Sequence, residues 1–110
     1  IAIWIVPRAV RLAWAALRIL LQEAPAHVDL PAVTDSLEAI PDVVDVHDLH
    51  VWTLTTDMDV LTAHLMVCDG ADQHGVLDRA RDVLADEHGI HHATLQVEPD
   101  THSGCDQVDW

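Results

Sequence analysis

The run VHDLHVWTL, from Val46 to Leu54, constrains the fold of this chain more than any other segment. Its β-branched and apolar residues predict a strand, because such side chains fit a pleated and partly buried surface. The run also carries His47, His50 and Asp48, and imidazole and carboxylate groups are ligands of divalent transition metals. A strand holds side chains in fixed directions, so the run predicts a rigid element that bears candidate metal ligands.

A second apolar run, residues 60–67, contains His64. The two runs are joined by a predicted four-residue turn and therefore predict a β-hairpin. Pairing Thr55 with Val60 across this turn places His47 and His64 on the same face, because side chains alternate along a strand.

The two faces of this hairpin differ in polarity. The same pairing puts Val51 opposite His64, on the face that also holds Leu49. The residues of the other face are predicted to form the helix-covered core: His50, Trp52, Leu54, Ala63 and Leu65. His47 and His64 are then predicted to lie on the open face of the sheet.

The remaining segments predict a small α+β domain. The expected elements are a helix over 2–23, a helix over 30–39, strands over 43–55 and 60–67, a helix over 73–88 and a strand over 90–98. After the first helix, this α-β-β-α-β order predicts an open-faced sandwich, in which two helices cover one face of a three-stranded sheet. The uncovered face is expected to be an interface.

Charge is distributed unevenly along the 110 residues, whose formal net charge is -14. The first 22 residues carry three arginines and no acid, whereas the rest carry two arginines and all 19 acids. An acidic chain without lysine predicts no nucleic-acid partner, because phosphates need cations, and favours metal cations instead. The apolar, arginine-bearing start predicts a membrane-proximal segment that belongs to a longer protein.

Motifs for catalysis are missing from the sequence. There is no HExxH motif and no nucleophile motif, so we expect no enzyme. The two cysteines, Cys68 and Cys105, lack the CxxC spacing that a copper-chaperone loop needs.

Residues 40–54, IPDVVDVHDLHVWTL, resemble the cytosolic C-terminal domain of the cation diffusion facilitator family, the efflux transporters of zinc and other divalent metals. Residues 20–25, 61–65 and 91–98 are similar to the same family, so the resemblance covers roughly residues 8–98. It implies a ferredoxin-like fold that forms a homodimer, with metal sites at or near the interface.

The resemblance also implies a division of the chain into three parts. Residues 1–24 are expected to be the end of the last transmembrane helix or its cytosolic extension, 25–99 the cytosolic metal-binding and dimerisation domain, and 100–110 a polar tail. The whole protein is then a proton-coupled efflux transporter of the inner or plasma membrane, whose transmembrane domain is a partner missing here. This portion is expected to be cytoplasmic and regulatory.

The family resemblance suggests individual metal ligands. His47, His64, His74 and Glu98 match metal positions of the family, and zinc is the expected ion, with cadmium, cobalt, nickel and manganese also compatible. Gln96 stands where some members have a histidine ligand. The tail residues His102 and Cys105 resemble ligands that some members donate to a partner subunit, and Asp45 and Asp48 are candidates for orienting the imidazoles.

One alternative function stays open at this point, a free-standing metal-binding or ligand-sensing module of ferredoxin-like fold. Under either interpretation, metal binding should weaken below about pH 6, because an imidazole must be deprotonated to act as a ligand.

Overall fold

The structure of the protein is a computed structural model, which describes residues 2–101. The order of elements is α1 (Ala2–Leu20), α2 (Leu30–Glu38), β1 (Val43–Thr55), β2 (Met58–Val67), α3 (Gln73–His88) and β3 (His92–Pro99). The strands form one sheet in the order β1-β2-β3, with β1 antiparallel and β3 parallel to β2. This is the predicted α-β-β-α-β sandwich after an N-terminal helix.

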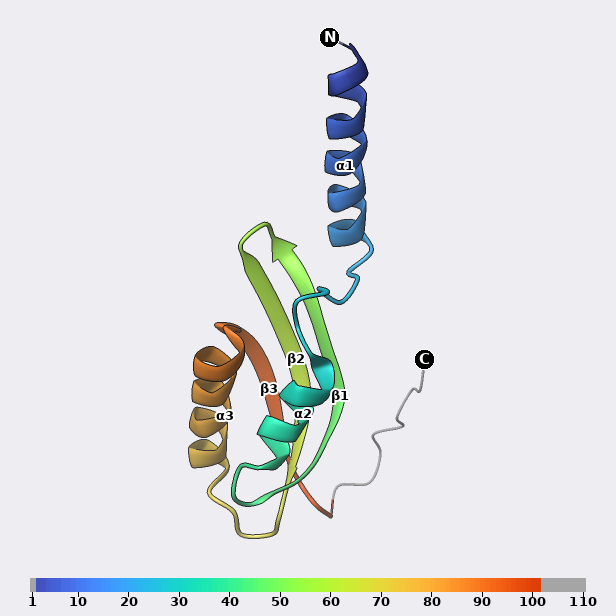
Figure 1. The fold of residues 1–110 in the computed structure, drawn as a ribbon. Helices are drawn as coiled ribbons and strands as arrows, with labels where there is room; N and C mark the ends of the chain where they lie inside the picture. Colours follow the sequence, from blue (N-terminus) through green and yellow to red (C-terminus); the bar gives the residue numbers. More distant parts are fainter. Residues whose placement is uncertain (1, 102–110) are drawn as a thin grey trace.

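Helices α2 and α3 contact each other and cover one face of the sheet, whereas α1 extends away from it (Figure 1). Among the helices of residues 2–101, none is both long enough and apolar enough to cross a membrane.

Local signals account for the ends of α2 and α3. The Asp29 carboxylate accepts a hydrogen bond from the backbone N–H of Ala32, and the Asp72 carboxylate does the same for Gly75. Each satisfies one of the backbone donors that a helix leaves unpaired at its start. Helix α3 stops at Gly89, which adopts the left-handed conformation at φ 68°, where glycine avoids the steric cost that a Cβ brings.

The core lies between the two helices and the sheet. Its side chains are apolar and buried, and they come from α2, β1, β2, α3 and the loops that follow the two helices: Val33, Leu37, Ile40, Val46, Val51, Leu61, Ala63, Leu65, Val67, Val76, Ala80, Leu84 and Ile90. Ala63 and Leu65 are therefore core residues, as predicted.

The hairpin register differs from the prediction. The turn contains two residues instead of four, because Thr55 pairs with Met58. His47 lies directly opposite His64, and the residue opposite Val51 is Leu61. The predicted pairings of Thr55 with Val60 and of Val51 with His64 are therefore wrong.

An irregularity in β1 explains why the predicted faces were partly wrong. The register shifts between His47 and His50, and Asp48 within this bulge has a positive φ of 51°. Extra residues in one strand reverse the alternation of the side chains beyond them. Val51 consequently lies in the core, whereas His50 is exposed and Trp52 is half-buried.

Leu54 was also predicted to belong to the core, and this is wrong, since it is 54% exposed near the tip of the hairpin. The expected placement of His47 and His64 together on the face away from the helices is confirmed, because their strand neighbours Val46 and Leu65 point into the core.

Candidate metal centre

Three potential ligands converge on the open face of the sheet, one from each strand. His47 of β1 pairs with His64 of β2, and Glu98 of β3 lies two residues further along, opposite Met66. One ligand atom from each of the three side chains lies within 4.8 Å of the other two. The sheet thus brings together three of the four predicted metal residues, which are up to 51 positions apart in the sequence.

The contacts within this three-residue cluster are centred on the carboxylate. Oε1 of Glu98 lies 3.0 Å from Nδ1 of His64, and Oε2 of Glu98 lies 3.8 Å from Nε2 of His47. The two imidazole rings meet edge to face, with their centroids 5.3 Å apart. Both histidines therefore direct a ring nitrogen toward the same carboxylate.

Burial makes this cluster unusual for polar side chains. The side chains of His47 and Glu98 are 3% and 4% exposed, and that of His64 is 27% exposed. Among residues 2–101, Nε2 of His47 is buried and finds no hydrogen-bond partner. A buried polar atom without a partner typically lowers the free energy of unfolding by about 1–3 kcal/mol. Its presence in a folded domain therefore calls for a compensating ligand.

The donor set fits a divalent transition metal. Two imidazoles and one carboxylate are ligands that zinc and its neighbours accept, and zinc generally takes four. With Nε2 of His47 unprotonated, a cation between these atoms would give this buried nitrogen a partner and balance the charge of Glu98.

Neighbouring polar side chains hold the cluster in place. Nδ1 of His47 lies 3.2 Å from a carboxylate oxygen of Asp45, and Gln96 donates a hydrogen bond of 2.6 Å from its amide to Oε1 of Glu98. Asp45 thus contacts the imidazole, as predicted, whereas Asp48 is exposed in the bulge. The role of Gln96 was not predicted, although its position two residues before Glu98 on one strand places both side chains on the same face.

His74, the fourth predicted ligand, is not in the three-residue cluster. His74 lies at the start of α3, with its side chain 84% exposed and Nε2 3.6 Å from a carboxylate oxygen of Asp78. Its role as a metal ligand stays a prediction. His102 and Cys105 lie outside the described residues.

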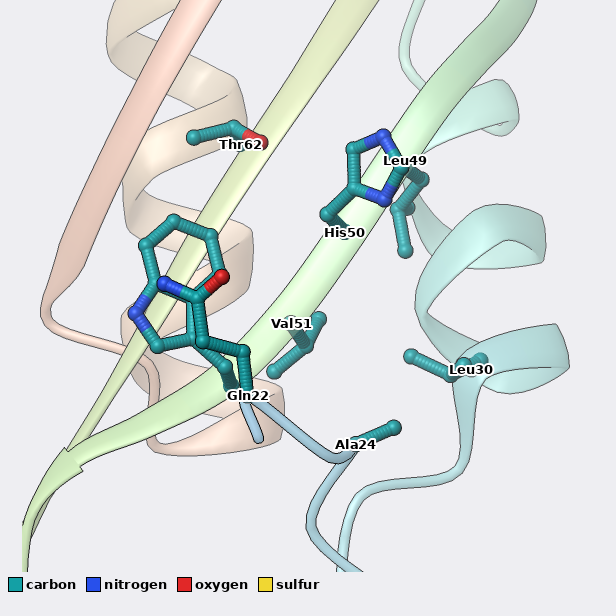
Figure 2. A pocket seen from close by; sticks show the side chains of 8 residues that line it. Gln22, Ala24, Leu30, Leu49, His50, Val51 and Thr62 are labelled. Carbon is teal, nitrogen blue, oxygen red and sulfur yellow. The ribbon is translucent and has the colours of Figure 1, made fainter. Parts of the chain in front are cut away.

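A separate cavity of about 420 Å³ lies between the linker after α1 and the hairpin. Figure 2 shows His50 and Thr62 at one end, on neighbouring strands, and Gln22 and Ala24 of the linker at the other. This cavity shares no residue with the three-residue cluster.

Cys68 is not part of the metal cluster, and its surroundings predict an unreactive thiol. Burial, followed by the carboxylate of Asp42 at 3.6 Å, raises the pKa of Cys68. A raised pKa lowers the thiolate fraction at a given pH, and the thiolate is the nucleophile. In a Cys105→Ser background, we expect Cys68 to react with iodoacetamide at pH 8 severalfold more slowly than a free cysteine.

Removal of the Asp42 charge tests this explanation. Asp42→Asn should speed alkylation, whereas Asp69→Asn, which removes an exposed carboxylate next to Cys68, should change the rate little. Equal rates for all three proteins would show that Asp42 does not control the thiol.

Comparison with known proteins identifies the family. Residues 25–100 match the family model described as cation efflux protein, cytoplasmic domain. The metal cation efflux system protein CzcD of Cupriavidus metallidurans is 36% identical over 110 residues, which are 99% of this chain and 34% of that protein. The probable proton-coupled zinc antiporter SLC30A3 of Mus musculus is 40% identical over 82 residues, covering 74% of this chain and 21% of that protein.

Solved structures show the same fold. The metal-bound C-terminal domain of the CzcD transporter superimposes with a TM-score of 0.62 at 38% identity, covering 64% of this chain and 99% of that one. The zinc form of the putative zinc transporter CzrB gives 0.52 at 21% identity, over 73% of this chain and 99% of that one, and supports the fold alone.

The chain spans about a third or less of the length of these curated relatives. The matched segment, residues 25–100, contains β1, β2 and β3, the strands that carry the three-residue cluster. The chain belongs to the cation efflux protein family, and it contains the cytoplasmic domain of that family.

Proposed function

We propose that this chain is the metal-sensing, dimer-forming part of a proton-coupled divalent-metal efflux transporter, and that His47, His64 and Glu98 bind the sensed ion. The observation that carries this proposal is the buried Nε2 of His47, which faces a buried carboxylate at 3.8 Å. When Nε2 of His47 carries no proton, it and the Glu98 carboxylate are two electron-rich groups in a buried space and attract a cation, and the surrounding acidic domain concentrates cations.

The hydrogen bonds around the cluster support this role. When the Asp45 carboxylate accepts the proton of His47 Nδ1, the unprotonated nitrogen of that ring is Nε2, which is the one directed at Glu98. Gln96 donates to Glu98 and restricts the rotation of its carboxylate. These contacts prepare the ligands before the ion arrives, which reduces the entropy that binding would otherwise cost.

Zinc is the proposed principal ion. Imidazole nitrogens favour zinc over magnesium and calcium, which prefer sites made of oxygen atoms alone. The relative SLC30A3, which is 40% identical over 82 residues, is named a probable proton-coupled zinc antiporter. Cadmium, cobalt, nickel and manganese could occupy the same ligands with different affinities.

We further propose that the domain forms a homodimer through the open face of its sheet, where Trp52, Val60 and Met66 are only half-buried. In the whole protein, residues 1–24 would join the domain to a membrane part that performs the proton-coupled transport. Residues 25–99 would be its cytoplasmic regulatory domain, and 100–110 its tail.

Calorimetric titration with zinc tests the proposed site. The parent chain is expected to bind zinc with micromolar or tighter affinity, and His47→Ala/His64→Ala should weaken binding by at least about 100-fold, because two of three ligands are lost. The matched control is His91→Ala/His92→Ala, which removes two exposed histidines, one just before β3 and one at its start. Equal zinc affinity in the two double variants would refute the site, and sedimentation with and without zinc would report dimer formation.

A further inference from the structure

The linker between α1 and α2, residues 21–29, is anchored on the domain at two points. Pro25 is buried, and Val28 packs against the core beneath the helices. The backbone N–H of Val28 donates a hydrogen bond of 3.0 Å to the carbonyl oxygen of Pro25, which closes a turn with Ala26 and His27 at its centre. The linker therefore presents the side chain of His27 from a turn that is fixed at both ends.

His27 contacts a carboxylate 32 positions away in the sequence, that of Asp59 near the start of β2. Nε2 of His27 lies 2.6 Å from Oδ2 of Asp59. An ionised carboxylate only accepts hydrogen bonds, so Nε2 is the donor, and an imidazole can donate from this atom whether it is neutral or charged. The other oxygen of Asp59, Oδ1, accepts a hydrogen bond of 2.8 Å from the hydroxyl of Thr53, its partner on β1. Both carboxylate oxygens are thus engaged.

The surroundings of the two side chains decide how firmly this contact holds the linker. The side chain of Asp59 is only 16% exposed, whereas that of His27 is 70% exposed. Exposed pairs usually contribute little, partly because holding two mobile side chains in one geometry costs entropy. Here the turn positions His27 and the Thr53 hydroxyl positions Asp59, so less entropy remains to be lost when the two meet.

Helix α1 is separated from the end of the hairpin by open space. A cavity of about 510 Å³ lies between them, lined by Leu12 and Ile19 of α1 and by Thr53 and Thr56 of the hairpin. His27 lines the same cavity. Since α1 is not packed closely on the hairpin there, the direction in which α1 leaves the domain depends on how firmly the linker is held.

We propose that His27, Asp59 and Thr53 form a linker clasp, which fixes residues 24–28 against the hairpin and makes the linker a rigid connector instead of a hinge. In the whole protein, the linker clasp would hold α1 and the domain at one angle. That consequence rests on the proposed join through residues 1–24, whereas the linker clasp itself involves neither the metal site nor a membrane.

Nitrogen relaxation NMR on the whole chain, without metal, tests the proposal. In the parent, the backbone amides of Ala26, His27 and Val28 should have order parameters of about 0.85, the value of rigid backbone. His27→Ala and Asp59→Ala should each lower these values below about 0.6, while the amides of α2 and β2 stay at about 0.85 and show that the domain remains folded. The double variant should match either single variant, because each change alone removes the same interaction.

The matched control is Asp57→Ala, which removes an exposed carboxylate from the hairpin turn and should leave the linker as rigid as in the parent. Equal loosening by Asp57→Ala and Asp59→Ala would mean that the charge of the hairpin end, and not the linker clasp, holds the linker. Low order parameters in the parent would make the linker a hinge, and unchanged values in both single variants would mean that the turn alone fixes it. A larger loss in the double variant would mean that the two residues act independently.

Each of these four results overturns the proposal. Failure of zinc binding is a separate result, because the variants of the linker clasp leave His47, His64 and Glu98 unchanged.

Discussion

The Glu98→Gln variant is expected to bind zinc about 100-fold more weakly than the parent chain while unfolding at a higher temperature. Loss of affinity follows from the proposed site, because a neutral amide replaces an anionic ligand and does not balance the charge of the ion. The gain in stability has a separate cause, which lies in the hydrogen bonds of the cluster.

Glutamine has the same shape as glutamate. With its oxygen at the position of Oε1, it could still accept from Gln96 and His64, which now lie 2.6 and 3.0 Å from that atom. Its amide nitrogen would then replace Oε2 and could donate to the buried Nε2 of His47. Satisfying that atom should add about 1 kcal/mol to the free energy of unfolding, or about 5 °C.

Calorimetry and thermal denaturation without metal measure the two effects. Glu87→Gln is the matched control, since it makes the same change at an exposed position on α3 and should alter neither quantity. An unchanged zinc affinity in Glu98→Gln would remove the carboxylate from the site. A lower stability without metal would show that the His47–Glu98 contact is favourable as it stands.

The Leu65→Ala variant is expected to lose about 3 kcal/mol of stability, a large fraction of the 5–15 kcal/mol that folded domains typically have. Leu65 is fully buried on the central strand and belongs to the core beneath the helices. Its truncation removes apolar contacts and leaves a cavity that neighbouring side chains fill only partly.

Urea unfolding provides the measurement, with Leu54→Ala as the control. Leu54 is 54% exposed near the hairpin tip, so the same truncation there should cost less than about 1 kcal/mol. Similar losses in the two variants would mean that the corrected assignment of the hairpin faces is wrong. Because Leu65 is the neighbour of His64, the Leu65 variant should also be tested for zinc binding under conditions where it remains folded.

Prediction from the sequence succeeded where short-range chemistry decides the structure. Asp29, Asp72 and Gly89 fix helix ends through contacts within a few residues, and α2 and α3 begin and end within one residue of the predicted ranges. The alternation of side chains along the strands also placed His47 and His64 on one face, because their apolar neighbours are buried on the other face, in the core.

Prediction failed along β1 beyond His47. The hydrophobic pattern suggested that Trp52 and Leu54 were buried, but the bulge at Asp48 reverses the alternation and puts Val51 into the core instead. A bulge has no simple sequence signature when the left-handed residue is an aspartate instead of a glycine. The two-residue turn was missed for a related reason, because residues 56–59 contain no glycine or asparagine to indicate its type.

The sequence by itself determined the order of elements, the family and the residue types available for metal binding, because helix caps, hydrophobic periodicity and motifs depend on residues close together in the chain. Only the tertiary structure decided that His47, His64 and Glu98 form one cluster, with Asp45 and Gln96 beside it and His74 apart from it. The physical reason is that the cluster depends on the registers of three strands, including a parallel pairing of β3 formed after a helical crossover. Those registers are set by the packing of the whole core.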